Sequence, residues 1–147
     1  MAVNADFVGR TYPPSGPYPV SAAQIAAFAA AVGANDPVHI DAQAAQAAGY
    51  RDVIAPPTMA VKYEQATSAA YVADPEAGID FTRVVHGEQQ FVHHRPITAG
   101  DDLVGQSTVA SIRQAGGHSM ITVRTELTHA GEPVCTVTST IVVRGGE

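Results

Sequence analysis

The hydrophobic pattern of this chain changes its period once, near residue 82, and this change limits the folds open to it. Before it, apolar residues recur at helical spacing, and after it they alternate, as in strands with one buried face. The alternating segments lie at about 82–94, 102–113, 118–129 and 133–144. Helices followed by a run of long strands predict an α+β domain with an antiparallel sheet.

Turn residues separate the four predicted strands. The joins read Ala99-Gly100-Asp101, Ala115-Gly116-Gly117 and Ala130-Gly131-Glu132. Glycine beside small or acidic residues suits tight turns between antiparallel strands. Three hairpin connections in succession therefore predict a meander.

The first helix is predicted from its two ends. Ser21 and Gln24 have the spacing of a capping box, and apolar residues then recur at helical spacing up to Gly33, a natural stop. The helix is rich in alanine, whose small side chain permits close approach, so we expect the sheet to wrap around this helix. Before it, the prolines of residues 1–20 predict an ordered arm that ends in a short edge strand.

Two further helices are predicted before the strands. Asp41 is placed to cap a helix over 42–48, which Gly49 ends. A third helix over 58–72 follows Pro56-Pro57, since prolines are tolerated at a helix start.

Length, charge and cysteine content narrow the classes of protein. A chain of 147 residues suits a single domain over 1–147. Acidic residues outnumber basic ones by 14 to 8 and Lys62 is the only lysine, so we expect no nucleic-acid partner and no binding to an anionic membrane surface. The longest apolar run, 25–32, is shorter than the roughly 20 residues of a membrane span, and residues 1–10 do not resemble a signal peptide. The single Cys135 is expected to be a buried thiol and suits a cytoplasmic protein.

The densest polar cluster occupies residues 33–41, in the predicted loop between the first two helices. Asp36 and His39 lie three residues apart there, and a carboxylate beside an imidazole suits general acid–base catalysis near neutral pH. The alternative is structural, because aspartates in loops commonly cap helices or turns. In that case Asp36 and Asp41 would be caps, and His39 would pack or bond locally.

The order of residues in this cluster resembles a known motif. Residues 32–41, followed by Gly49-Tyr50 and Val53-Ile54-Ala55, resemble the hydratase motif of MaoC-like hot-dog proteins. That motif reads glycine–aspartate–any–asparagine–proline–aliphatic–histidine–any–aspartate. Further on, residues 91–97 and the turn Gly100-Asp101 resemble the same family. The opening Phe7-Val8-Gly9-Arg10-Thr11-Tyr12 and the segment 54–58 are closer to one branch, the N-terminal-type MaoC dehydratases of actinobacteria, which include subunits of (3R)-hydroxyacyl-ACP dehydratase.

The resemblance implies a single hot-dog fold, a long central helix wrapped by a curved antiparallel sheet, which works as a homodimer or as a heterodimer with another hot-dog subunit. It implies a substrate on coenzyme A or acyl carrier protein in fatty-acid metabolism. The reaction interconverts (3R)-3-hydroxyacyl and trans-2-enoyl thioesters by loss or addition of water. In active members the aspartate and histidine hold the water and move protons, and a backbone N–H at the next helix start polarises the thioester carbonyl. No cofactor is implied.

Carried over residue by residue, the motif histidine is His39 and its last aspartate is Asp41. The catalytic aspartate position holds Ala34, which has no carboxylate. Asp36, at the asparagine position, could substitute only if the loop turns its side chain inward. Pro57 stands at the glycine whose N–H polarises the carbonyl, and proline has no N–H. A shift by one residue would give that role to the Thr58 amide, because free N–H groups cluster at a helix start.

These departures leave two functions open. In the first, the chain is itself a dehydratase: His39 and Asp36 are catalytic, and the residues implied in substrate binding are Ala55, Pro57, Thr58, Asp41 and Tyr63. In the second, it is a non-catalytic subunit that houses the acyl chain while a MaoC-like partner supplies the intact pair. A hot-dog thioesterase fits less well, because the proline–aliphatic–histidine–any–aspartate loop belongs to the hydratase pattern.

Other candidate residues favour structural roles. Tyr63 and Tyr71 of the predicted third helix could line an acyl tunnel, although aromatic side chains on a helix more commonly pack in a core or an interface. His86, His93 and His94 share one predicted strand, without the cysteine and histidine spacing of a zinc site. We therefore predict no metal site and interpret these histidines as solvated or interface residues.

Overall fold

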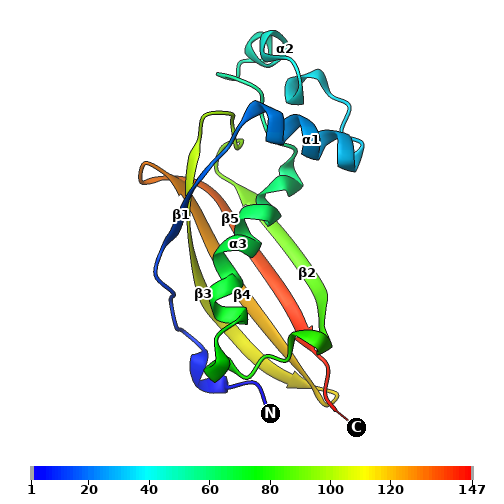
Figure 1. The fold of residues 1–147 in the computed structure, drawn as a ribbon, viewed down its shortest axis with the longest axis vertical. Coiled ribbons are helices and arrows are strands. Elements are labelled where there is room, and N and C mark those ends of the chain that lie inside the picture. Colours follow the sequence, from blue (N-terminus) through cyan, green and yellow to red (C-terminus); the bar gives the residue numbers. More distant parts are fainter. Residues whose placement is uncertain (1, 147) are drawn as a thin grey trace.

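The computed structural model describes residues 2–146 and consists of one curved sheet with a helix across its concave face (Figure 1). All strand pairs are antiparallel, in the order β1-β3-β4-β5-β2. The strands are β1 (Ser15–Pro19), β2 (Val84–His93), β3 (Asp102–Ala115), β4 (His118–His129) and β5 (Glu132–Val143). The helices are α1 (Ala22–Val32), α2 (Ala42–Ala47) and α3 (Ala60–Val72). The predicted α+β class is confirmed, as is the short strand in the N-terminal arm.

The first helix forms with the predicted ends. The hydroxyl of Ser21 accepts from the Gln24 amide at 3.1 Å, and the Gln24 side chain accepts from the Ser21 amide at 3.2 Å, which completes a capping box. Gly33 follows the helix with φ 70°, a left-handed conformation that favours glycine. Asp41 caps α2 by accepting from the Gln43 amide at 2.9 Å.

The predicted meander is wrong at its first join. β3, β4 and β5 follow one another through two hairpins, but β2 pairs with β5 at the far edge, with Phe91 opposite Val137. Residues 94–101 are therefore a crossover and not a hairpin. They are held by bonds to another segment, among them the Ala55 amide to the Ile97 carbonyl at 2.8 Å. Alternation reveals which face of a strand is buried but not which strand lies beside it.

The helix that the sheet wraps is α3, not the alanine-rich α1 (Figure 1). α3 buries six of its residues, including Tyr63, Thr67 and Tyr71, whereas α1 lies beyond the end of the sheet and buries only Ile25 and Ala29. The close approach comes from a glycine on the strand side. A Cβ on Gly105 of β3 would overlap Thr67 Oγ1 and lie 2.9 Å from Thr67 Cβ. The close packing of helix and sheet thus depends on a small residue of the sheet, and not on small residues of the helix as predicted.

The core has two clusters, one at each end of α3. The cluster near α1 includes Met59, Tyr63, Ile97, Leu103 and Cys135, and the other gathers around Phe7 and Tyr71. No helix within residues 2–146 has the length and hydropathy needed to cross a membrane.

Candidate functional site

His39 lies in the loop between α1 and α2, at the end of a short 3-10 turn over Pro37–His39. Asp36 caps this turn, accepting from the Val38 amide at 3.1 Å. His39 is 8% exposed, and its Nδ1 lies 2.7 Å from the carbonyl oxygen of Ile54. A carbonyl can only accept, so Nδ1 carries a proton, and Nε2 has no hydrogen-bond partner within residues 2–146.

His39 borders a pocket of about 730 Å³ where the loop after α1, the segment before α3 and the end of β2 meet. The side chains from the end of β2 bring histidine and arginine to its wall. The lining residues are Asp36, Val38, His39, Ala48, Tyr50, Ile54, Ala55, Pro57, His93, His94, Arg95 and Pro96. The pocket thus combines apolar walls with a buried imidazole, a combination suited to an apolar substrate with a reactive polar end.

The turn that precedes the central helix contributes Pro57 to the wall of this pocket. Residues Pro57–Met59 make a 3-10 turn that runs into α3, and the Met59 amide donates to the Pro56 carbonyl at 3.0 Å. The Thr58 amide donates to no residue in the described part of the chain, and Pro57 has no N–H. His93 Nε2 donates to the Pro57 carbonyl at 2.9 Å and so holds this turn. The turn therefore offers one free backbone donor, that of Thr58.

The structure brings together several of the predicted site residues. His39, Asp36, Ala55 and Pro57 line the pocket, and Thr58 follows directly after Pro57. Asp36 is exposed and its carboxylate accepts from its own turn, while its backbone carbonyl accepts from the His39 amide at 3.1 Å. No hydrogen bond joins the two side chains within residues 2–146.

Asp41 and Tyr63 lie outside the pocket wall. Asp41 is the exposed cap of α2. Tyr63 is 3% exposed in the core, where its ring lies 6.2 Å from that of Tyr18, and burial raises the pKa of its phenol. The family's aspartate position, Ala34, has its amide bonded to the Ala29 carbonyl at 2.8 Å, which fixes the loop as it leaves α1.

The sequence did not predict His93, His94 and Arg95 as pocket residues. The available signal was the run of these three residues before Pro96, where the strand alternation ends. His94 Nε2 lies 3.0 Å from Thr136 Oγ1, and the three guanidinium nitrogens of Arg95 donate to Asp101, Glu132 and the Pro96 carbonyl. These side chains shape the wall, while Nε2 of His39 has no hydrogen-bond partner within residues 2–146.

Cys135 lies in the first half of β5 and is fully buried, as predicted. Burial raises the pKa of its thiol to about 11. Since the thiolate is the reactive form, we expect the folded protein to react with a disulfide reagent at least about 10²-fold more slowly than the urea-unfolded chain at about pH 8. Absorbance of the released thiol measures both rates, and equal rates would contradict this burial.

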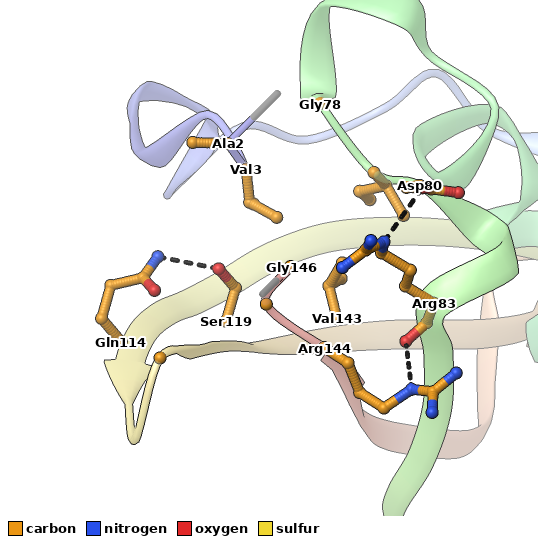
Figure 2. Close-up of a pocket in the computed structure, with 13 residues that line it drawn as sticks. Ala2, Val3, Gly78, Asp80, Arg83, Gln114, Ser119, Val143, Arg144 and Gly146 are labelled. Atoms are coloured by element: carbon orange, nitrogen blue, oxygen red, sulfur yellow. Dashed lines mark hydrogen bonds and ion pairs between the residues drawn. The ribbon is translucent and has the colours of Figure 1, made fainter.

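A second hollow of about 780 Å³ lies at the opposite end of the molecule, near both termini (Figures 1 and 2). Its two arginines already have partners. Arg83 Nε lies 3.5 Å from Asp80 Oδ2, and Arg144 Nε donates to the Arg83 carbonyl at 3.4 Å (Figure 2). Among residues 2–146 the lining of this hollow includes no histidine and no buried carboxylate, so the pocket beside His39 is the stronger candidate for chemistry.

Known proteins are similar in sequence to this chain along almost its whole length. The family model for the FAS1-like dehydratase domain region matches residues 6–137. A UPF0336 protein of Saccharopolyspora erythraea is 49% identical over 146 residues, which are 99% of this chain and 94% of that protein.

Solved structures show the same fold. A MaoC-like dehydratase superposes with a TM-score of 0.88 and 35% identity over 95% of this chain, which spans only 43% of that longer chain. The C-terminally truncated HadBC (3R-hydroxyacyl-ACP dehydratase) complex from Mycobacterium tuberculosis gives a TM-score of 0.84 at 27% identity, over 93% of this chain and 97% of that one. The predicted hot-dog fold is confirmed by these neighbours. The chain belongs to the FAS1-like dehydratase-region family of MaoC-like hot-dog proteins.

Proposed function

We propose that this chain is one subunit of a (3R)-3-hydroxyacyl-thioester dehydratase, which in reverse is a trans-2-enoyl-thioester hydratase. The observation that carries the proposal is the buried imidazole of His39 in a largely apolar pocket, with its Nδ1 proton fixed on Ile54 and its Nε2 free. An imidazole nitrogen without a proton can act as a general base.

In the hydration direction, His39 Nε2 takes a proton from water, and the hydroxyl oxygen bonds to C3 of the enoyl thioester. The electron pair of the C2–C3 double bond moves toward the thioester carbonyl, whose oxygen gains negative charge. In this proposal the Thr58 amide, which has no partner within residues 2–146 and follows the pocket residue Pro57, would hold that oxygen as an oxyanion donor does. The proton held on His39 Nε2 then passes to C2 as the electron pair returns from the carbonyl oxygen, which regenerates the neutral imidazole. Dehydration is the same sequence reversed.

A second hot-dog subunit completes the site in this proposal. Ala34 cannot supply the carboxylate of the family motif, and Asp36 bonds to its own turn. The long edge strand β2 has no partner beyond β5 within residues 2–146 and exposes Val85 and Val92. Such an edge is a template for pairing with another chain. The HadBC dehydratase complex, a structural relative at 27% identity, supports a two-subunit assembly.

The substrate would be an acyl thioester on coenzyme A or acyl carrier protein, and this chain would house the acyl part. The expectation of a cytoplasmic location stays a prediction. The competing proposal is an enzyme active alone, for which the retained His39 is the main support.

The two proposals differ in a direct assay. We expect the purified chain alone to hydrate crotonyl-coenzyme A slowly, and an equimolar mixture with a MaoC-like protein that has the full aspartate–histidine motif to exceed the sum of the separate rates by about tenfold or more. The loss of enoyl absorbance measures the rate. A His39→Ala chain, alone and in the mixture, is the matched control.

Each outcome selects a function. Full activity of the chain alone that disappears in His39→Ala would favour the self-sufficient enzyme. A gain in the mixture that survives His39→Ala would assign catalysis to the partner and acyl binding to this chain. No hydration in any mixture, with crotonyl or a longer enoyl thioester, would overturn the proposed function.

A further inference from the structure

Asp101 carries a carboxylate that is completely buried, at the end of the crossover 94–101. Its two oxygens accept from both Nη atoms of Arg95, at 2.8 and 3.0 Å, and one of them accepts from the Thr98 amide at 2.9 Å. A third, exposed donor, Arg51 Nη2, lies 3.3 Å away. Burial alone would raise the pKa of Asp101, but Arg95 and the Thr98 amide hold it below its ordinary value. The carboxylate is therefore ionised at neutral pH, with donors from three residues around it.

The turn that Asp101 organises supports the segment before α3. The Ala55 amide donates to the Ile97 carbonyl at 2.8 Å, and the Ala99 amide donates to the Val53 carbonyl at 3.0 Å. Ile54 and Thr98 form an isolated antiparallel bridge between the two segments. Residues 53–55 are thus attached to the turn along their whole length.

The same segment holds the catalytic loop. The Ile54 amide donates to the Val38 carbonyl at 3.1 Å, and the Ile54 carbonyl accepts from His39 Nδ1 at 2.7 Å. The turn also holds the residue just before the cap of α1, because the Val20 amide donates to the Asp101 carbonyl at 2.8 Å. The turn around Asp101 is therefore bonded both to the segment that precedes α1 and to the segment that holds His39.

We propose that Asp101 is a positioning residue: through Thr98 and residues 53–55, it fixes the Ile54 carbonyl that sets the tautomer and orientation of His39. The positioning of His39 by Asp101 does not depend on the proposed function; only the use of His39 as a base rests on it. A carboxylate is needed because every group that faces its oxygens is a donor. An asparagine would turn an N–H₂ toward Arg95 or Thr98 and leave one of these donors without an acceptor.

The test is nuclear magnetic resonance of the chain with ¹⁵N-labelled histidine. In the wild type we expect a slowly exchanging His39 Nδ1 proton and a single tautomer. In Asp101→Asn, folded by circular dichroism, we expect exchange at least about tenfold faster and a ¹⁵N pattern that reports mixed tautomers. Arg95→Gln should move both readouts in the same direction. Arg51→Ala, which removes only the exposed donor, should leave both near wild type.

If the variants fail to fold, a measurement on the wild-type protein still tests the proposal. Under low urea, the amides of Thr98 and Ala55 and the ring proton of His39 should exchange through one common opening. The proposal is overturned if a folded Asp101→Asn keeps the wild-type signal, if Arg51→Ala has the same effect as Asp101→Asn, or if the three protons open independently. None of these readouts needs turnover, so a positive result with no hydration activity would leave the positioning role standing while the proposed function fails.

Discussion

Replacing Gly105 with alanine should lower the free energy of unfolding by about 3 kcal/mol, because the added Cβ would enter the space of the Thr67 side chain. Gly105 lies in β3 under the central helix, and Thr67 is 3% exposed, with its hydroxyl donating to the Tyr63 carbonyl at 2.7 Å. Neither side can yield cheaply, since the helix is packed on the sheet and the strand is paired on both sides. Urea titration followed by circular dichroism measures the loss, as the chain has no tryptophan.

A double-mutant cycle separates this contact from other effects of alanine. Thr67→Ala removes Oγ1 and Cγ2, two of the three atoms that the new Cβ meets, so Gly105→Ala should cost at least about 1 kcal/mol less in that background. The matched control is Gly87→Ala in β2, where the nearest atoms, of Thr140 and Val142, lie at 3.3 Å and the cost should be small. Equal losses for the two glycines would contradict the role of Gly105 as the point of closest approach.

Local rules predicted the local structure of this chain well. The capping box of Ser21 and Gln24, the stop at Gly33 and the alternation of β3, β4 and β5 depend on residues close in sequence, and all are present. The order of the strands does not depend on such neighbours. β2 pairs with β5, about fifty residues later, and no pattern within either strand specifies that choice.

The prediction that the sheet wraps the alanine-rich helix α1 was wrong for a related reason. Small residues in a helix permit close packing but do not require it. Here the decisive small residue is Gly105, in a strand that meets α3 only after the sheet has closed. α1 instead places its C-terminal end at the loop that carries His39.

The candidate site was predictable where the motif is contiguous and not where it depends on distant contacts. His39, Ala55 and Pro57 were all identified from residues 33–58, and they line one pocket. Arg95 was not, because its role depends on Asp101 and on a turn that supports residues 53–55 from forty positions away. A sequence shows the histidine, whereas the structure shows what fixes its proton.

Replacing Ala34 with aspartate should increase hydration of crotonyl-coenzyme A by the chain alone by about 10²-fold. Ala34 stands at the position of the motif's catalytic carboxylate, five residues before His39. Its site can accept the change, since Ala34 is only half-buried and the loop is held by its own backbone bond to Ala29. The new carboxylate would hold the attacking water opposite the free Nε2 of His39.

Two matched variants make this gain specific to proton transfer. Ala34→Asn has nearly the same shape without a basic carboxylate, and Ala34→Asp combined with His39→Ala lacks the imidazole, so neither should exceed the wild-type rate. The comparison uses initial rates at saturating thioester, with folding checked by circular dichroism. A gain that appears equally in Ala34→Asn would show that loop shape, not the carboxylate, limits the rate. No gain in Ala34→Asp, with binding of the thioester intact, would mean that this subunit lacks more than one carboxylate and that its part in catalysis is to hold the acyl chain for its partner.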